Sequence, residues 1–263
     1  MPSLTEEQKK EFKAIIDRAL DIADSFWKES GGELEKEVAL SSHVVDSINE
    51  SINYSEESIS TKIPNFDRIS SNKSVNGELI AIVADMRNST EHAKTVTRIM
   101  NPLRRIFLET SALLPAMEKA ISIKKGSVTE YLGDGVLGFF EFNEGNIYNS
   151  YNASKIIINE VGPMLNLTLN ERYGLPINGI NIGVGLAKSK AIIYAAGIES
   201  KHPKAFGSCV YDATKLSSGM NFIGVSNELK AAWPSTKNGT LQFQKFDFPR
   251  GNFSGYKVNP RNR

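Results

Sequence analysis

The spacing of hydrophobic positions changes near residue 77. Before that point, apolar residues recur at helical spacing and predict one helix from Thr5 to Trp27, with Thr5 as its N-cap. Its apolar stripe must be buried, against either the rest of the chain or a second subunit. The stripe consists of Ile15, Ile16, Leu20, Ile22, Ala23, Phe26 and Trp27. Residues 31–76 are rich in Ser, Glu and Asn and predict a connector, with at most a short helix over 35–52.

After Gly77, short apolar runs alternate with longer amphipathic segments. Strands are predicted over 78–85, 121–132, 136–142, 177–186, 191–197, 221–225, 240–246 and 253–258. Helices are predicted over 89–119 with breaks near Pro102 and Pro115, over 146–173 with a kink at Pro163 unless it is two helices, and over 212–220. This order predicts an α+β fold with helices on one face of a sheet. We expect an N-terminal helical extension and connector, residues 1–76, followed by one domain, residues 77–263.

The composition mainly excludes classes of partner and location. The chain has 31 basic and 30 acidic residues, so no overall charge favours binding to nucleic acid or to a membrane surface. Its one cysteine, Cys209, cannot form an internal disulfide. The first residues are polar, unlike a signal peptide, and no apolar run is long enough to span a bilayer. These features predict a cytoplasmic protein.

Two aspartates carry the candidate chemistry. Asp85 ends the apolar run LIAIVAD, and Asp134 lies in the hairpin signal Gly133-Asp134-Gly135. Two carboxylates at strand ends can hold Mg²⁺ or Mn²⁺, because these hard cations prefer oxygen ligands; the backbone carbonyl of Met86 is a candidate third ligand. Either aspartate alone would be read as a helix cap or a turn residue. Together they predict a two-metal site.

Three segments carry a family resemblance, in the same order and with similar spacing. They are ADMRNST at 84–90, the Gly133-Asp134-Gly135 hairpin, and AFGSCVYDATKL at 205–216. Residues 77 to about 260 thereby resemble the catalytic domain of class III nucleotidyl cyclases. The resemblance implies a ferredoxin-like βαββαβ core, two Mg²⁺ or Mn²⁺ ions per active site, and a homodimer with shared active sites. It also implies a phosphorus–oxygen lyase reaction, in which the ribose 3′-hydroxyl attacks the α-phosphate of a nucleoside triphosphate.

The resemblance assigns further site residues. Lys215 stands where the family has a transition-state arginine, and Tyr211 where it has an asparagine. Backbone N–H groups of Asn88, Ser89 and Thr90 are candidates to bind the β- and γ-phosphates. Arg250 lies near the position of a triphosphate-binding lysine, although a surface arginine is the better interpretation. Arg87 is predicted to be a surface charge.

Base selection is predicted to involve Glu130 and Lys204, which occupy the family's two purine-reading positions. The Glu130 carboxylate can accept a hydrogen bond from a ring N–H of the base, and the Lys204 ammonium can donate one to a carbonyl beside it. Uracil and guanine present an edge of this kind. The large ring of Tyr211 favours a pyrimidine, whereas a one-residue slip would bring Tyr131 into the pocket instead.

The pattern resembles the pyrimidine cyclases of the bacterial Pycsar anti-phage system, with UTP as substrate and cyclic UMP and pyrophosphate as products. That resemblance implies a separate effector that responds to the cyclic nucleotide. Cytidylate or guanylate cyclase activity, and a degenerate cyclase domain that only senses nucleotide, remain alternatives.

Overall fold

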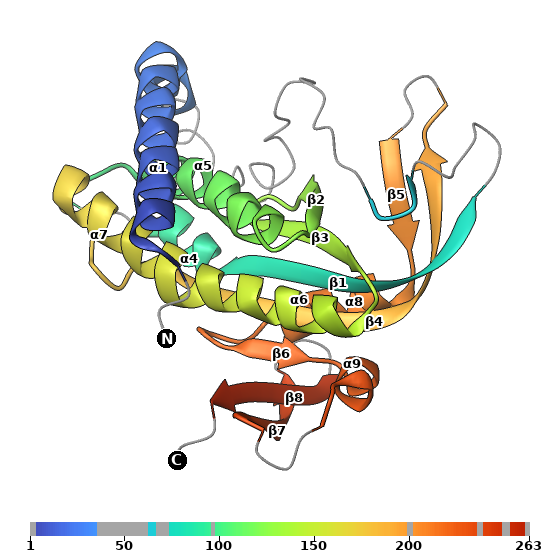
Figure 1. Ribbon diagram of the computed structural model, residues 1–263. Helices are drawn as coiled ribbons and strands as arrows, with labels where there is room; N and C mark the ends of the chain where they lie inside the picture. The colour runs from blue at the N-terminus through green and yellow to red at the C-terminus, as the bar shows by residue number, and fades with distance from the viewer. Residues whose placement is uncertain are drawn as a thin grey trace.

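The domain is built on one mixed sheet with helices packed against it, as seen in the computed structural model (Figure 1). The structure describes residues 4–35, 63–66, 74–95, 98–198, 202–235, 239–248 and 253–260. The predicted short helix over 35–52 lies almost wholly outside the described residues. None of the described helices combines the length and apolarity needed to cross a membrane.

Within the described residues, the sheet has eight strands. They are β1 (Val75–Arg87), β2 (Ser127–Tyr131), β3 (Gly135–Glu141), β4 (Asn181–Ala196), β5 (His202–Phe206), β6 (Ile223–Val225), β7 (Leu241–Phe248) and β8 (Phe253–Pro260). Their order is β2-β3-β1-β4-β6-β8-β7, with β5 paired to β4. Among these described strands, only the β4–β6 pairing is parallel. The chain order β1, helices, β2, β3, helices, β4 gives the βαββαβ core predicted from the resemblance.

The helices divide between the two faces of the sheet. They are α1 (Glu6–Phe26), α4 (Ser89–Lys94), α5 (Pro102–Ser122), α6 (Glu144–Ile156), α7 (Gly162–Tyr173), α8 (Ser208–Leu216) and α9 (Asn227–Ala232), with π-helical turns η1 (Trp27–Gly31) and η3 (Ile157–Val161). The long helices form the main core with alternate β1 residues, for example Ile80 and Ile82. Helix α8 packs on the opposite face, against Leu79, Ala81 and Val83. We call this opposite face the α8 face.

The first half of the domain differs from the prediction at two places. Residues 121 and 122 end helix α5, so β2 begins only at Ser127. Pro102 starts α5 as predicted, but Pro115 lies inside α5 and does not break it. An internal proline costs roughly 3 kcal/mol; burial of the apolar residues on either side of Pro115 offsets this cost.

In the second half, residues 144–173 form two α-helices joined by the π-helical turn η3, which was the predicted alternative to a single kinked helix. Pro163 lies in the first turn of the second helix, where a proline is tolerated. Other elements of this half differ from the prediction. The two strands predicted over 177–197 are one strand, because β1 pairs with β4 without interruption from Asn181 to Ile193. Helix α8 begins at Ser208, earlier than predicted. Strand β5 and helix α9 were not predicted, since both are too short to show a period.

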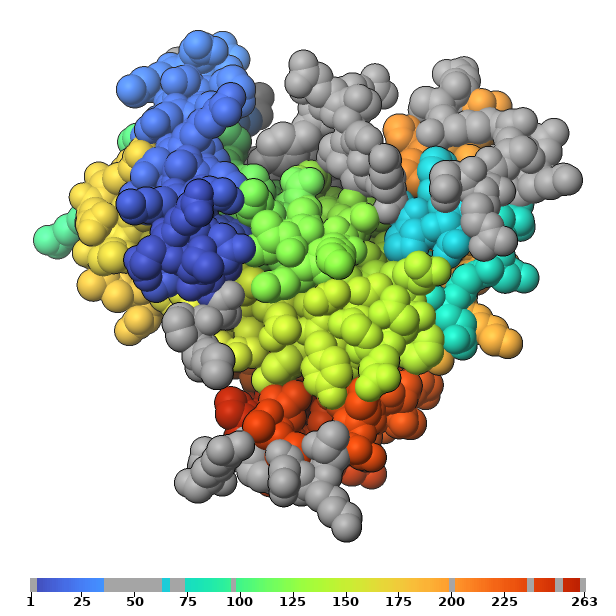
Figure 2. Space-filling model, in the orientation of Figure 1, coloured from blue at the N-terminus to red at the C-terminus, as the bar shows by residue number. Residues whose placement is uncertain are grey.

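Helix α1 packs on the main domain, mainly against α5 and also against α7 (Figures 1 and 2). Thr5 caps it through a capping box with Gln8. The buried side is Phe12, Ile16, Leu20 and Ala23, whereas Ile22 and Phe26, which belong to the predicted stripe, are exposed.

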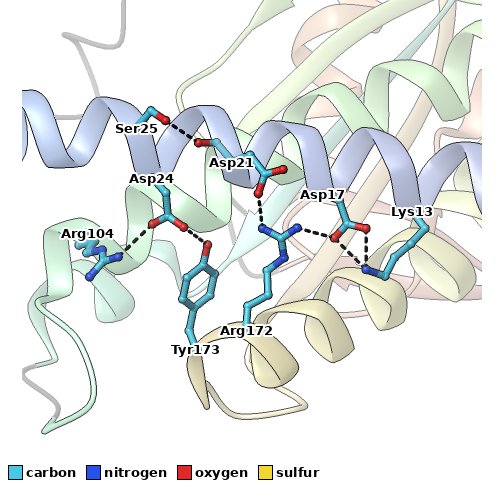
Figure 3. A network of polar contacts seen from close by, with 8 residues as sticks. All are labelled: Lys13, Asp17, Asp21, Asp24, Ser25, Arg104, Arg172 and Tyr173. Carbon is cyan, nitrogen blue, oxygen red and sulfur yellow. Dashed lines mark hydrogen bonds and ion pairs between the residues drawn. The ribbon is translucent and has the colours of Figure 1, made fainter.

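Ion pairs hold α1 in register against α5 and α7 (Figure 3). Arg172 donates to Asp17 at 2.9 Å and to Asp21 at 2.7 Å, and Asp24 accepts from Arg104 at 2.9 Å and from Tyr173 at 2.6 Å. Burial alone would raise the pKa of Asp24, but the hydrogen bonds from Tyr173 and Arg104 outweigh it and lower that pKa. A lowered pKa in the folded state means that this contact stabilises the fold at neutral pH and is lost on acidification.

Candidate active site

Pairing of β1 with β3 brings the two predicted metal-binding aspartates to one end of the sheet. Asp85 lies opposite Gly135, and the Met86 N–H donates to the Asp134 carbonyl at 3.2 Å. A Cβ atom at Gly135 would lie 2.7 Å from the carbonyl oxygen of Ala84. Glycine at this position therefore allows the hairpin to approach β1 closely enough to set Asp134 beside Asp85.

A cleft of about 430 Å³ lies at this end of the sheet, on the α8 face and beside the C-terminus of helix α8. It contains six of the residues predicted for the site: Asp85, Met86, Asn88, Ser89, Thr90 and Asp134. The Met86 side chain is buried in the main core, so only its backbone can serve the cleft. Thr214 of α8 and the C-cap residue Ser217 also line it and were not predicted.

The turn after Asp85 depends on Asn88. Its φ of 65° and ψ of 20° are left-handed, a conformation that asparagine tolerates better than most residues. The Asn88 carbonyl accepts from the N–H groups of Glu91 at 3.0 Å and His92 at 3.1 Å, whereas its side chain makes no capping bond. The left-handed residue turns the chain sharply, so that Ser89 and Thr90 also line the cleft.

A buried polar triad fixes α4, and with it this turn, to α5. His92 Nδ1 lies 2.7 Å from Glu109 Oε2, Arg105 Nε donates to Glu109 Oε1 at 2.8 Å, and Arg105 Nη2 lies 3.2 Å from His92 Nε2. Arginine can only donate, so His92 Nε2 is the acceptor in the contact with Arg105 and Nδ1 is the donor to the Glu109 carboxylate. Sequence reasoning missed this triad; the i, i+4 spacing of Arg105 and Glu109 was its only signal.

Arg87 is not the surface charge that was predicted. Its guanidinium donates to Asp85 in a short contact and lies 3.3 Å from the Ser217 carbonyl, and it lines the cleft. The side chains of Arg87 and Asp85 are only 14% and 17% exposed, respectively. The signal that the prediction missed was the spacing of Asp85 and Arg87. They are residues i and i+2 of one strand, and such residues point to the same face.

The two predicted base-reading residues form an ion pair. Lys204 Nζ of β5 lies 2.7 Å from Glu130 Oε2 of β2, and both side chains are partly exposed. A bulge at Thr129 shifts the register of β2, so that Glu130 lies opposite Leu137 on the α8 face. Tyr131 consequently points to the opposite face, where it donates to Glu118 of α5. The slip that would have brought Tyr131 into the pocket does not occur.

Tyr211 and Lys215 are one turn apart on α8 and are not among the residues that line the cleft. Lys215 Nζ lies 5.2 Å from the centre of the Tyr211 ring, and 58% of the Tyr211 side chain is exposed. Helix α8 lies directly on β4, since a Cβ atom at Gly185 would lie 1.9 Å from the Ala213 carbonyl oxygen. Tyr211 is exposed and Lys215 is partly exposed, and neither lines the cleft that holds Asp85 and Asp134.

The donor set of the cleft fits a hard divalent cation but provides few protein ligands. Asp85 and Asp134 supply carboxylate oxygens at the same cleft. Within the described part of the chain, no group of three or more His, Cys, Asp or Glu residues is arranged to hold a metal ion. Cations at this site would therefore need further oxygen ligands from substrate or water. The predicted triphosphate ligand Arg250 lies outside the described residues.

Comparison with solved structures identifies the fold. The adenylyl cyclase CyaB from P. aeruginosa matches with a TM-score of 0.58 at 14% identity, over 73% of this chain and 98% of that one. The guanylyl cyclase Cya2 matches with a TM-score of 0.53 at 16% identity, over 70% and 93%. A class III adenylyl cyclase-like ATP-binding protein from Pseudomonas aeruginosa matches with a TM-score of 0.55 at 12% identity, over 66% of this chain and 40% of that one.

No family model and no curated protein sequence matches the chain. At the low identities of the structural matches, similarity establishes the fold alone. The predicted class III nucleotidyl cyclase-like α+β fold is therefore confirmed.

Proposed function

We propose that this protein is a homodimeric nucleotidyl cyclase that converts UTP to cyclic UMP and pyrophosphate. The observation that carries the proposal is the placing of Asp85 and Asp134 in one cleft of a class III cyclase fold. Two Mg²⁺ or Mn²⁺ ions bound by these carboxylates would lower the pKa of the ribose 3′-hydroxyl and neutralise the pyrophosphate leaving group.

The residues of the turn would hold the triphosphate. Asn88, Ser89 and Thr90 line the same cleft as the two aspartates, so a triphosphate bound there would meet their N–H and hydroxyl groups. Arg250 remains a proposed triphosphate ligand, on the resemblance alone. The buried triad supports this role of the turn by fixing α4 against α5.

A complete site is proposed to need a second copy of the chain. Lys215 would stabilise negative charge on the α-phosphate, but it does not line the cleft of its own chain. Two large side chains in this part of the chain are also exposed: Phe206 at the end of β5, at 72%, and Tyr211 of α8, at 58%. A twofold dimer would cover such a surface and bring Tyr211 and Lys215 of one chain to the aspartates of the other.

Selection of the base is proposed to use the Glu130–Lys204 pair. The pair lies 2.7 Å apart, so a base edge that bridges it must offer a donor and an acceptor on neighbouring atoms. Uracil offers N3–H beside a carbonyl, and guanine offers N1–H beside O6. The Tyr211 ring next to the base favours the smaller uracil. A pyrimidine product would suit a second messenger of anti-phage defence, read by a separate effector.

Replacing Glu130 by alanine is expected to change base preference more than metal binding. The variant loses the acceptor for N3–H, so the kcat/KM ratio of UTP to CTP should fall by about 10- to 100-fold. The measurement is kcat/KM for the four nucleoside triphosphates. Glu141→Ala, at the exposed end of β3, is the matched control. An unchanged preference among the four would remove Glu130 from the base pocket.

Separate incubation of the purified protein with Mn²⁺ and each of ATP, GTP, CTP and UTP tests the substrate assignment. Mass spectrometry should identify cyclic UMP as the main product. Cyclic CMP would keep a pyrimidine cyclase but contradict the reading of the Glu130–Lys204 pair, and cyclic GMP would contradict the role given to Tyr211.

A second candidate is a nucleotide sensor without turnover. Lysine and tyrosine replace the arginine and asparagine of the cyclase signature, and one structural neighbour is a class III adenylyl cyclase-like ATP-binding protein. Retention of both aspartates argues for the enzyme, because a sensor does not need a two-metal site. Tight nucleotide binding without any cyclic product would favour the sensor.

A further inference from the structure

Arg87 and Asp85 form a partly buried ion pair inside the proposed metal cleft. The Arg87 guanidinium donates to an oxygen of Asp85, an atom that a divalent cation would need. It also lies 3.3 Å from the carbonyl of Ser217, at the end of α8. Arg87 thus spans from the metal-binding strand to the helix that carries Lys215.

The charges that line the cleft give Arg87 a second possible partner. Its described lining includes three carboxylates, Asp85, Glu91 and Asp134, and a single cationic side chain, that of Arg87. A nucleoside triphosphate brings several negative charges into this space. A guanidinium suits phosphate oxygens because its planar fork can donate two parallel hydrogen bonds.

We propose that Arg87 exchanges partners during substrate binding: it neutralises Asp85 when the cleft is empty and binds the triphosphate when a cation takes Asp85. This proposal rests on the proposed function, because it takes the triphosphate and the cation from it. Because of this exchange, Arg87 opposes the binding of metal in the absence of nucleotide, but it is a ligand when metal and nucleotide bind together. It therefore couples the two binding events, so that the site fills with metal and nucleotide together.

The experiment measures two affinities of the full-length protein and of its Arg87→Gln variant. The first is for Mn²⁺ alone, and the second is for Mn²⁺ with 3′-deoxy-UTP, which cannot cyclise. Loss of the competing guanidinium should tighten binding of Mn²⁺ alone by about 5- to 10-fold. Loss of a charged phosphate contact should weaken binding of Mn²⁺–3′-deoxy-UTP by about 10-fold or more. Changes of opposite sign are the signature of partner exchange.

Three further variants sharpen the result. Arg87→Lys keeps the charge, so Mn²⁺ affinity should stay near wild type while nucleotide affinity falls partway. In an Asp85→Asn background, Arg87→Gln should no longer tighten Mn²⁺ binding, because the contested ligand is gone. Arg18→Gln, at an exposed position of α1, is the matched control and should change neither affinity.

The proposal is overturned if Arg87→Gln weakens both affinities, leaves both unchanged, or if neither protein binds Mn²⁺ without nucleotide. These outcomes are distinct from failure of the proposed function. Opposite shifts in a protein that makes no cyclic nucleotide would support the exchange and refute the cyclase. A wild-type protein that forms cyclic UMP, with a variant that lacks the opposite shifts, would refute the exchange alone.

Discussion

Replacing Asp134 by asparagine should lower turnover by about 10³-fold or more, because the cleft then keeps only one of its two metal-binding carboxylates. The substitution preserves shape and removes charge. Asp134 lies in the hairpin between β2 and β3, outside the hydrophobic clusters that hold the sheet together. The measurement is the rate of cyclic nucleotide formation at saturating Mn²⁺, together with thermal unfolding of the same preparation.

Asp85→Asn should cause a loss of the same order, although it also leaves Arg87 without its carboxylate partner. Asp134 is therefore the better position to test, because its substitution leaves the Asp85–Arg87 ion pair in place. Asp247→Asn, at an exposed position of β7, is the matched control and should keep wild-type activity. Activity near the wild-type rate in either site variant, with the fold intact, would refute the two-metal site.

Mixing two inactive variants should restore activity if each site is shared between two chains. Asp134→Ala removes a metal ligand, and Lys215→Ala removes the proposed transition-state charge. A mixed dimer then has one site with both defects and one site with neither. With free exchange of chains, half of the dimers are mixed and each has one of two sites intact, so activity should recover to about a quarter of wild type. The measurement is cyclic nucleotide formation after subunit exchange.

The matched control is a mixture of Asp85→Asn with Asp134→Asn. Both residues lie in the cleft of the same chain, so every site of their mixed dimer keeps one defect and no recovery is expected. Absence of recovery with Lys215→Ala, in a dimer verified to be mixed, would contradict shared sites.

The sequence predicted the core of the fold because its strands are long and apolar. The continuous apolar run of β1, buried from Leu79 to Ala84, and the Gly-Asp-Gly hairpin were enough to predict these strands and the turn. The resemblance of three segments to class III cyclases supplied the βαββαβ order and the expectation that Asp85 and Asp134 lie close together. Short elements escaped prediction for a physical reason. Strand β5 has five residues and helix α9 has six, too few to establish a period.

Contacts between distant segments could not be read from the chain. The ion pair of Glu130 with Lys204 depends on how β5 approaches β2, and the face that Glu130 occupies depends on a bulge at Thr129. No local pattern predicts either feature. The role of Arg87 is different, because its spacing from Asp85 already placed both on one face of a strand. A general expectation that arginines lie at the surface outweighed that specific signal.

The central claim is that this site forms a cyclic nucleotide by attack of the substrate's own 3′-hydroxyl. The most direct test measures cyclic UMP and pyrophosphate together, from one reaction of the wild-type protein with UTP and Mn²⁺, beside a parallel reaction with 3′-deoxy-UTP. We expect equal amounts of the two products from UTP and neither from 3′-deoxy-UTP. Release of UDP or UMP without cyclic UMP, or pyrophosphate release that persists with 3′-deoxy-UTP, would contradict it.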